Sequence, residues 1–238
     1  MNLARLACLG GVAVGALVAW SPQANAALVC GFSSCTETVS STTQSAGTGG
    51  FLGFTLYDPA THGGGASLSS VVYALSGNVF GTAEAENRVA APAVLTLSLA
   101  ATIAALKPLS ITAVSVVIPT STNVFSASAF DGVIDFGGTS GISLTALSAS
   151  AGPVVNVLFA PGDLSLFTGI GTVLVPYTSS ATSSATGSGT VTSSFVTDYN
   201  MSLTITYNFE PNNAPEPASL ALLGLGLAGL VGMRRRKA

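Results

Sequence analysis

The chain has 238 residues, of which 48% are hydrophobic and only 7% are charged. Between residues 27 and 214 the only cations are Arg88 and Lys107, against nine acidic residues, so the net charge of this part is 2 − 9 = −7. A body with so few cations offers no surface for a phosphate backbone, and this excludes nucleic-acid binding as its function. Its length is enough for one domain of ordinary size.

The N-terminus has the pattern of a secretory signal peptide. Arg5 precedes an apolar run over residues 6–20, and Ala24-Asn25-Ala26 follows as an A-x-A cleavage site. We therefore predict a signal peptide at residues 1–26 with cleavage after Ala26. A retained N-terminal membrane helix is the alternative.

Two cysteines remain after this cleavage, Cys30 and Cys35. An even pair in an exported protein predicts a disulfide that closes a small loop, with free thiols as the alternative. A zinc site would need more ligands, and His62 is the only histidine, so no metal site is expected.

Short apolar or alternating segments, separated by Gly, Pro, Ser and Thr, fill the body of the chain. They predict strands at residues 51–57, 68–80, 89–105, 109–118, 125–136, 142–149, 154–159, 173–176, 190–196 and 201–209. The alanines within 89–105 would also suit a helix. Residues 36–50 are expected to be a connector or a weak edge strand, and residues 84–88 to face solvent. Residues 178–194 are expected to be a loop that leads into a strand.

The clearest strand signal is at residues 201–209. Five hydrophobic residues alternate strictly with Ser202, Thr204, Thr206 and Asn208, which predicts a strand with one buried and one wet face. Many such strands without an amphipathic helix predict an all-β domain at residues 27–210. We expect an antiparallel β-sandwich of jelly-roll or Ig-like kind, with a closed barrel as the alternative.

No catalytic constellation is recognisable, so we expect a protein that is not an enzyme and has no cofactor. His62, the only candidate base of its kind, lies in a glycine-rich stretch, and no G-x-S-x-G elbow is present. Asp131 and Asp135 share a face of an extended segment, as do Glu84 and Glu86. Such pairs could act as acid and base or bind Ca²⁺, although solvated carboxylates at strand ends are the simpler interpretation.

The C-terminus has three consecutive parts. Pro215-Glu216-Pro217 follows a linker at residues 211–214 and precedes an apolar segment at 219–233, and the cluster Arg234-Arg235-Arg236-Lys237 comes next. The apolar segment predicts a short transmembrane helix, although a full span needs about 20 residues. The cations should stop transfer and stay on the cytoplasmic side.

These three parts, in this order over residues 215–238, resemble a PEP-CTERM sorting signal. The resemblance implies recognition by an exosortase, a membrane-embedded transpeptidase, with processing near Pro215-Glu216-Pro217. It also implies a Gram-negative setting in which exopolysaccharide is exported and biofilm forms. The protein would be anchored transiently in the inner membrane and then sorted to the cell surface or matrix.

The body resembles choice-of-anchor E domains through residues 51–59, 166–173 and 186–207. That resemblance implies display outside the cell and brings no catalytic residues. The sequence therefore predicts an exported, non-enzymatic surface or exopolysaccharide-matrix protein, with exosortase and exopolysaccharide as partners. The alternative is a carbohydrate- or calcium-binding adhesive module.

Overall fold

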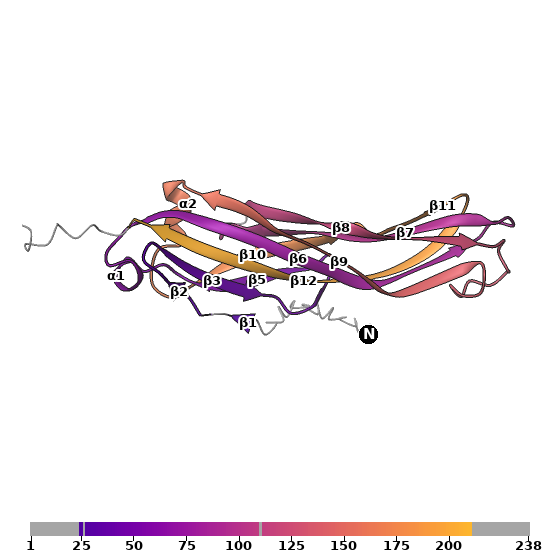
Figure 1. The fold of residues 1–238 in the computed structure, drawn as a ribbon, viewed down its shortest axis with the longest axis horizontal. Helices are drawn as coiled ribbons and strands as arrows, with labels where there is room; N and C mark the ends of the chain where they lie inside the picture. The colour runs from indigo at the N-terminus through magenta and orange to yellow at the C-terminus, as the bar shows by residue number, and fades with distance from the viewer. Residues whose placement is uncertain (1–23, 26, 110, 211–238) are drawn as a thin grey trace, which may run out of the picture.

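The fold was analysed in a computed structural model, which describes residues 24–25, 27–109 and 111–210. Most of these residues belong to two antiparallel sheets that run along an elongated body (Figure 1). Most of the predicted signal peptide and all of residues 211–238 lie outside the described residues. The all-β, antiparallel class predicted from the sequence is confirmed.

The first sheet has the order β1-β3-β12-β6-β9, with β2 beside β3 and β4 beside β12. Its strands are β1 (Ala24–Asn25), β2 (Val29–Cys30), β3 (Ser34–Ser40), β4 (Gln44–Ser45), β6 (Leu68–Asn87), β9 (Gly141–Leu158) and β12 (Val191–Phe209). The second sheet has the order β11-β7-β10-β5, with β8 on the other side of β7. Its strands are β5 (Gly49–Thr55), β7 (Ala93–Leu106), β8 (Thr112–Ala127), β10 (Thr172–Ala181) and β11 (Ser184–Gly187).

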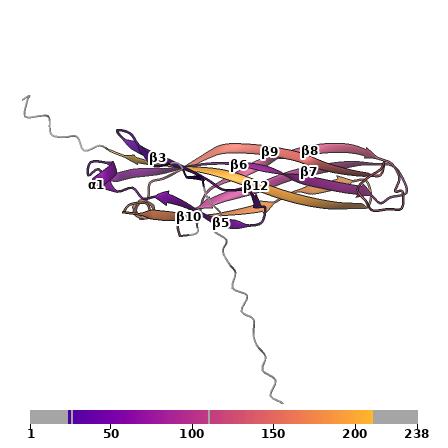
Figure 2. The ribbon, with the colours of Figure 1, turned by 90° about the horizontal axis from the view of Figure 1, so that it is seen from below.

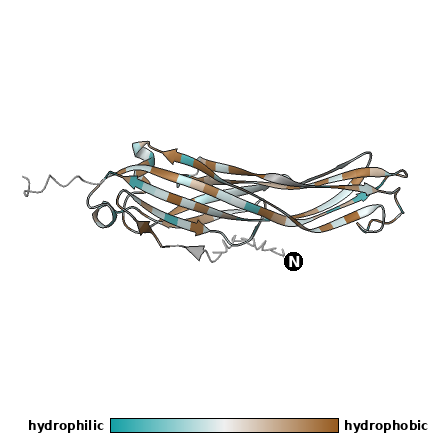
Figure 3. Cartoon of the chain, viewed as in Figure 1, coloured by the Kyte–Doolittle hydropathy of each residue, from teal (hydrophilic) through white to brown (hydrophobic). Residues whose placement is uncertain are grey.

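The central pair of the first sheet is β6 and β12, which pair from Asn87 and Val191 at one end to Leu68 and Phe209 at the other. Along both strands buried and partly exposed residues alternate, so one face joins the core and the other meets water. Figure 3 shows this alternation as hydrophobic and hydrophilic bands along the strands. The alternation predicted for residues 201–209 is therefore confirmed, and these residues form the end of the longer strand β12.

The apolar faces of the two sheets pack against each other, and the core between them has two parts. The larger part holds residues of both sheets, including the buried rings of Tyr57, Tyr73, Phe167 and Tyr207. The smaller part is built mainly from small side chains: Ala83, Ala85, Ala93, Leu95, Leu97 and Ala127. The short helices α1 (Pro59–His62) and α2 (Pro161–Ser165) lie at the end of the body where β12 finishes (Figures 1 and 2).

Several predicted boundaries are wrong. Residues 125–136 are not one strand, because β8 ends at Ala127 and a loop runs through 128–140. This loop turns at Gly132 and Gly138, whose φ angles of 97° and 62° lie outside the extended region of a regular strand. The segments 142–149 and 154–159 are one strand, β9. Residues 178–194 contain the end of β10, all of β11 and the start of β12 rather than one loop.

Two further expectations are resolved. Residues 89–105 contribute a strand, β7, and not a helix. Within 36–50, the residues of β3 have neighbours on both sides, β12 on one and β1 and β2 on the other, so they are neither a connector nor an edge. Their serine and threonine side chains lie on the outer face, which is why the segment resembles a connector in sequence.

Candidate functional site: a groove lined by hydroxyl and amide groups

The outer face of the first sheet carries a ladder of hydroxyl pairs between β3 and β12. Thr36 faces Thr206 with 3.1 Å between their Oγ1 atoms, and Thr38 faces Thr204 at 2.8 Å. The next rung is the hydrogen bond that Ser40 Oγ donates to Ser202 Oγ at 3.2 Å. The ladder follows from the period of two in both strands, which puts every second side chain on this face.

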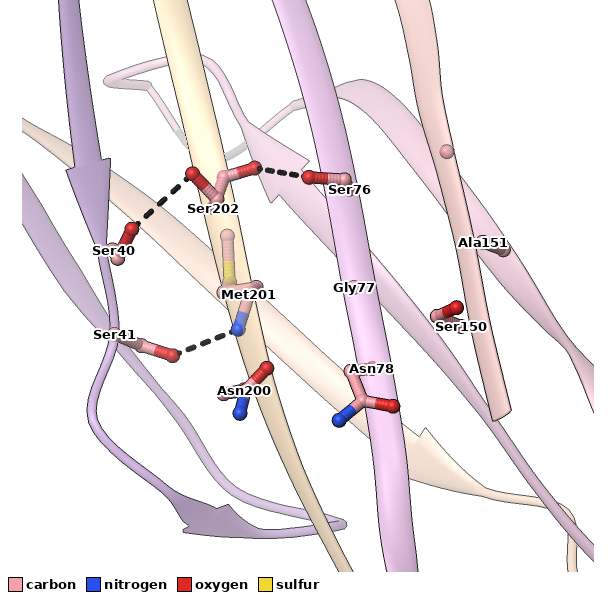
Figure 4. A pocket seen from close by; sticks show the side chains of 11 residues that line it. Ser40, Ser41, Ser76, Gly77, Asn78, Ser150, Ala151, Asn200, Met201 and Ser202 are labelled. Atoms are coloured by element: carbon pink, nitrogen blue, oxygen red, sulfur yellow. Dashed lines mark hydrogen bonds between the residues drawn. The ribbon is translucent and has the colours of Figure 1, made fainter. Parts of the chain in front are cut away.

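Below the last rung the face is hollowed by a groove of about 530 Å³ that crosses β3, β12, β6 and β9 (Figure 4). Its lining consists of neutral residues only: Ser40, Ser41, Ser76, Gly77, Asn78, Ser150, Ala151, Gly152, Asn200, Met201 and Ser202. The polar groups that it presents are therefore hydroxyls and carboxamides. Such groups can donate and accept hydrogen bonds but carry no charge.

Some of these polar groups are fixed by bonds within the protein. Ser41 Oγ accepts a hydrogen bond from the backbone N of Met201 at 3.1 Å, which ties the end of β3 to β12. Ser76 Oγ approaches the carbonyl oxygen of Ser202 at 3.5 Å, the upper limit for such a bond. With the Ser40–Ser202 bond, these contacts hold the upper wall of the groove in place (Figure 4).

The side chains of Asn200, Asn78 and Ser150 form a row with no such bonds. Asn200 is the direct cross-strand partner of Asn78, and Asn78 is the direct partner of Ser150, so the three lie side by side on β12, β6 and β9. Within the described part of the chain, none of the three side chains makes a hydrogen bond. Neighbouring strands are about 4.8 Å apart, so this row extends for about 10 Å across the sheet.

The groove exists because β9 is irregular where it passes Ser76. Leu75 pairs with Val154 and Gly77 with Ala151, so two residues of β9 oppose one residue of β6 in a bulge. Gly152 has a φ of 104°, and a β carbon there would lie 2.6 Å from the carbonyl oxygen of Leu75. No larger residue fits this position, so the floor of the groove at the bulge has no side chain.

The candidate acids lie elsewhere, at the far end of the body from α1 and α2. Asp131 Oδ1 accepts a hydrogen bond from the backbone N of Val133, and Asp135 Oδ1 accepts one from Gly137, so each closes a turn in the 128–140 loop. Among residues 24–25, 27–109 and 111–210, no group of three His, Cys, Asp or Glu side chains could hold a metal ion. A calcium role for Asp131 and Asp135 therefore finds no support in their arrangement.

The expectation that residues 84–88 face solvent is wrong for three of them. Ala85, Glu86 and Asn87 are fully buried, although Glu84 is partly exposed and Arg88 is exposed. The reason is the 128–140 loop, which folds back over the strand end: a β carbon at Gly141 would overlap Glu86 Oε2 and lie 2.6 Å from the backbone N of Gly137. Neither carboxylate oxygen of Glu86 has a hydrogen-bond partner among the described residues.

The remaining predicted residues are dispersed. His62 ends α1, and its Nδ1 accepts a hydrogen bond from the backbone N of Asp58 at 3.1 Å, far from the groove. Cys30 and Cys35 are joined in a disulfide between β2 and β3. Ala24 belongs to β1, whereas Ala26 lies outside the described residues, as do Pro215, Glu216, Pro217, Arg234, Arg235, Arg236 and Lys237.

The groove was not predicted from the sequence, in which Asn78 and Asn200 belong to no recognisable motif. The available signal was the alternation of polar residues in both strands, which places Asn78 and Asn200 on wet faces. Only the register between β6 and β12 shows that they are neighbours.

Comparison with known proteins identifies the tail. Residues 213–237 match the PEP-CTERM protein-sorting motif. No similar sequence was found among characterised proteins. Within the described part of the chain, no helix is long and apolar enough to cross a membrane.

Among solved structures, chains of infectious bursal disease virus are similar, with low TM-scores. A chain of the Gt strain is 12% identical with a TM-score of 0.13, covering 81% of this chain and 47% of that one. A chain of T=1 particles derived from the virus is 11% identical with a TM-score of 0.15, covering 88% and 47%. This chain thus spans about half the length of the solved chains, and TM-scores so low carry no inference.

Proposed function

We propose that the chain is a non-enzymatic, exported protein of the cell surface or the exopolysaccharide matrix, sorted by an exosortase-type transpeptidase. The observation that carries the proposal is the PEP-CTERM sorting motif at residues 213–237. That motif implies export, transient anchoring in the membrane and processing by an exosortase. The final location and the absence of catalysis are our inference.

The body supports this role by its composition. Part of the outer face of the first sheet carries hydroxyl and amide groups rather than charges, as the ladder and the groove show. Neither Asp131 nor Asp135 nor His62 forms a nucleophile–base pair among the described residues. The resemblance of the body to choice-of-anchor E domains favours display rather than catalysis in the same way.

The strand order supports a durable fold for such a display domain. The main strands form the sets β3-β12-β6-β9 and β5-β10-β7-β8, which is the connectivity of a jelly roll, and we assign the domain to this architecture. The apolar faces of the two sheets are buried against each other, which stabilises such a fold.

In the proposed route, the signal peptide is removed after Ala26 during export. The apolar segment 219–233 then holds the chain in the inner membrane, with Arg234-Arg235-Arg236-Lys237 on the cytoplasmic side. Exosortase processes the chain near Pro215-Glu216-Pro217, and the body moves to the surface or matrix. The exopolysaccharide exported by the same cell is the partner we expect there.

The test is the intact mass and cellular fraction of the protein in its native host, compared between the wild type and Glu216→Ala. We expect the wild type to begin at Ala27, to end near Pro215 and to leave the membrane fraction. The Glu216→Ala variant should retain Arg234 to Lys237 and remain in the membrane. Glu210→Ala, an acid substitution just outside the matched residues, is the matched control and should behave as the wild type.

Two results would overturn the proposal. Wild-type protein that keeps its basic tail in the membrane would show that the tail is a plain anchor. Full-length protein recovered from the cytosol, with residues 1–26 still attached, would show that the chain is not exported at all.

A further inference from the structure

The row Asn200, Asn78 and Ser150 is a set of unused hydrogen-bonding groups on paired strands of the described surface. The backbone of all three residues belongs to paired strands, so the side chains differ only in their rotamers. Each carboxamide offers two donors and an acceptor oxygen with two lone pairs. Two such groups side by side can bind the neighbouring hydroxyl groups of one ligand, each of which is both a donor and an acceptor.

The charge of the surroundings decides which polar ligand fits. None of the lining residues is charged, and the body from 27 to 214 carries a net charge of −7. The two cations are distant: Lys107 pairs with Asp163 at 2.7 Å, and Arg88 stacks on Phe130 at the far end. A phosphate, sulfate or uronate polymer would be repelled and would find no partner here.

The shape of the groove favours an extended ligand. The row crosses three strands, and Gly152 in the bulge carries no side chain, so a chain can approach the backbone closely there. The fixed hydroxyls of Ser40, Ser76 and Ser202 border the row on one side (Figure 4). The groove is open, so a chain can enter it from the side without threading.

We infer that this groove binds a neutral polysaccharide through the carboxamides of Asn78 and Asn200 and the hydroxyl of Ser150. The inference rests on the proposed surface or matrix location, where the protein would meet such a polymer. No aromatic ring lines the groove, so stacking on a sugar face is absent and each contact is weak. Binding therefore depends on repetition along the polymer and on many copies of the protein.

Affinity electrophoresis tests the inference with the full-length chain, purified in a detergent without a sugar headgroup. Native gels contain hydroxyethyl cellulose, glycol chitin or dextran as neutral polymers, or dextran sulfate as the anionic one. We expect at least one neutral polymer to retard the protein and dextran sulfate to have no effect. The double variant Asn78→Ala/Asn200→Ala should lose at least tenfold in apparent affinity.

The matched control is Asn208→Ala. Asn208 lies on the same strand and the same face but outside the groove, where its Nδ2 donates to Ser70 Oγ at 3.0 Å. This variant should bind as the wild type does. Melting curves of all variants exclude unfolding as the cause of lost binding.

Three results would overturn the inference: no retardation by any of the three neutral polymers, undiminished binding by the double variant, or stronger retardation by dextran sulfate. The assay does not depend on sorting. Glu216→Ala protein, which fails to be processed if the proposed function is correct, should bind like the wild type, so failure of one proposal is distinguishable from failure of the other.

Discussion

The hydroxyl groups of two buried tyrosines, Tyr207 and Tyr73, have different surroundings, and this difference should affect the stability of the protein. Tyr207 Oη donates a hydrogen bond to the carbonyl oxygen of Thr55 at 2.8 Å, which links the two sheets. Tyr73 is equally buried, but in the described part of the chain its Oη has no hydrogen-bond partner. A buried hydroxyl without a partner costs about 1–3 kcal/mol relative to water, whereas a bonded one contributes about 1 kcal/mol.

We therefore predict opposite effects from the same substitution. Tyr207→Phe should lower the free energy of unfolding by about 1–2 kcal/mol, since it leaves the Thr55 carbonyl unpaired. Tyr73→Phe should leave it unchanged or raise it by up to about 1 kcal/mol, because its edge-on contact with Phe167 at 5.9 Å remains. Urea unfolding measures both, and an equal loss in the two variants would contradict the prediction.

Glu86, like Tyr73, has buried polar atoms without a hydrogen-bond partner among the described residues, but its group is a carboxylate. Its carboxylate is buried under the 128–140 loop with both oxygens unpaired, and an unpaired buried charge is more costly than an unpaired neutral group. We predict that Glu86→Gln raises the free energy of unfolding at neutral pH by about 1 kcal/mol or more. Thermal or urea unfolding provides the measurement.

Glu84→Gln is the control for this prediction. Glu84 lies two residues away on the same strand, is partly exposed, and accepts a hydrogen bond from Ser143 Oγ at 3.0 Å. Its substitution should change stability by less than about 0.5 kcal/mol. If Glu86→Gln destabilised the protein instead, the carboxylate would have a partner in solution, such as a water molecule or a cation.

At the scale of the element, strands with one wet and one buried face could be predicted, and strands without that contrast could not. β12 shows strict alternation over residues 201–209 because each inward residue is apolar and each outward one is polar. β11, in contrast, is a short strand of Ser, Ala, Thr and Gly with no apolar face, so its sequence resembles a loop.

The opposite error occurred at the 128–140 loop. Val133 and Ile134 suggested a strand, yet both are exposed in the structure. Two Asx turns and glycines with positive φ angles reverse the chain there, and these local preferences outweigh β propensity. The same loop buries Glu86, and this burial could not be predicted from the sequence either.

The groove could not be predicted for another reason. Asn78 and Asn200 are far apart in the sequence and meet only through the register of β6 with β12. Register depends on the entire hydrophobic pattern of both strands, and a shift by one residue would turn either side chain to the other face. The tail needed no such information, because its three parts are contiguous, and the match at residues 213–237 confirmed it.

At the scale of the whole molecule, the larger part of the core contains buried tyrosines drawn from both sheets. Burial raises the pKa of both Tyr73 and Tyr207 far above the ordinary value. Tyr207 and Asp163 raise the pKa of Tyr73 further by a smaller amount, and Glu37 does the same for Tyr207. In the unfolded chain both phenols ionise near pH 10. Between pH 10 and the higher folded-state pKa values, the unfolded chain therefore binds fewer protons than the folded protein.

This difference predicts an alkaline limit to stability. The stabilisation that comes from the two raised phenol pKa values is fully present below about pH 10. Above about pH 10 the free energy of unfolding should fall by about 1.4 kcal/mol per pH unit for each tyrosine. Urea unfolding at intervals from pH 8 to 11.5 measures the slope. The double variant Tyr73→Phe/Tyr207→Phe should flatten it, and a residual slope is expected because burial also raises the pKa of Tyr177. If the double variant lost stability as steeply as the wild type, the alkaline transition would begin outside this core.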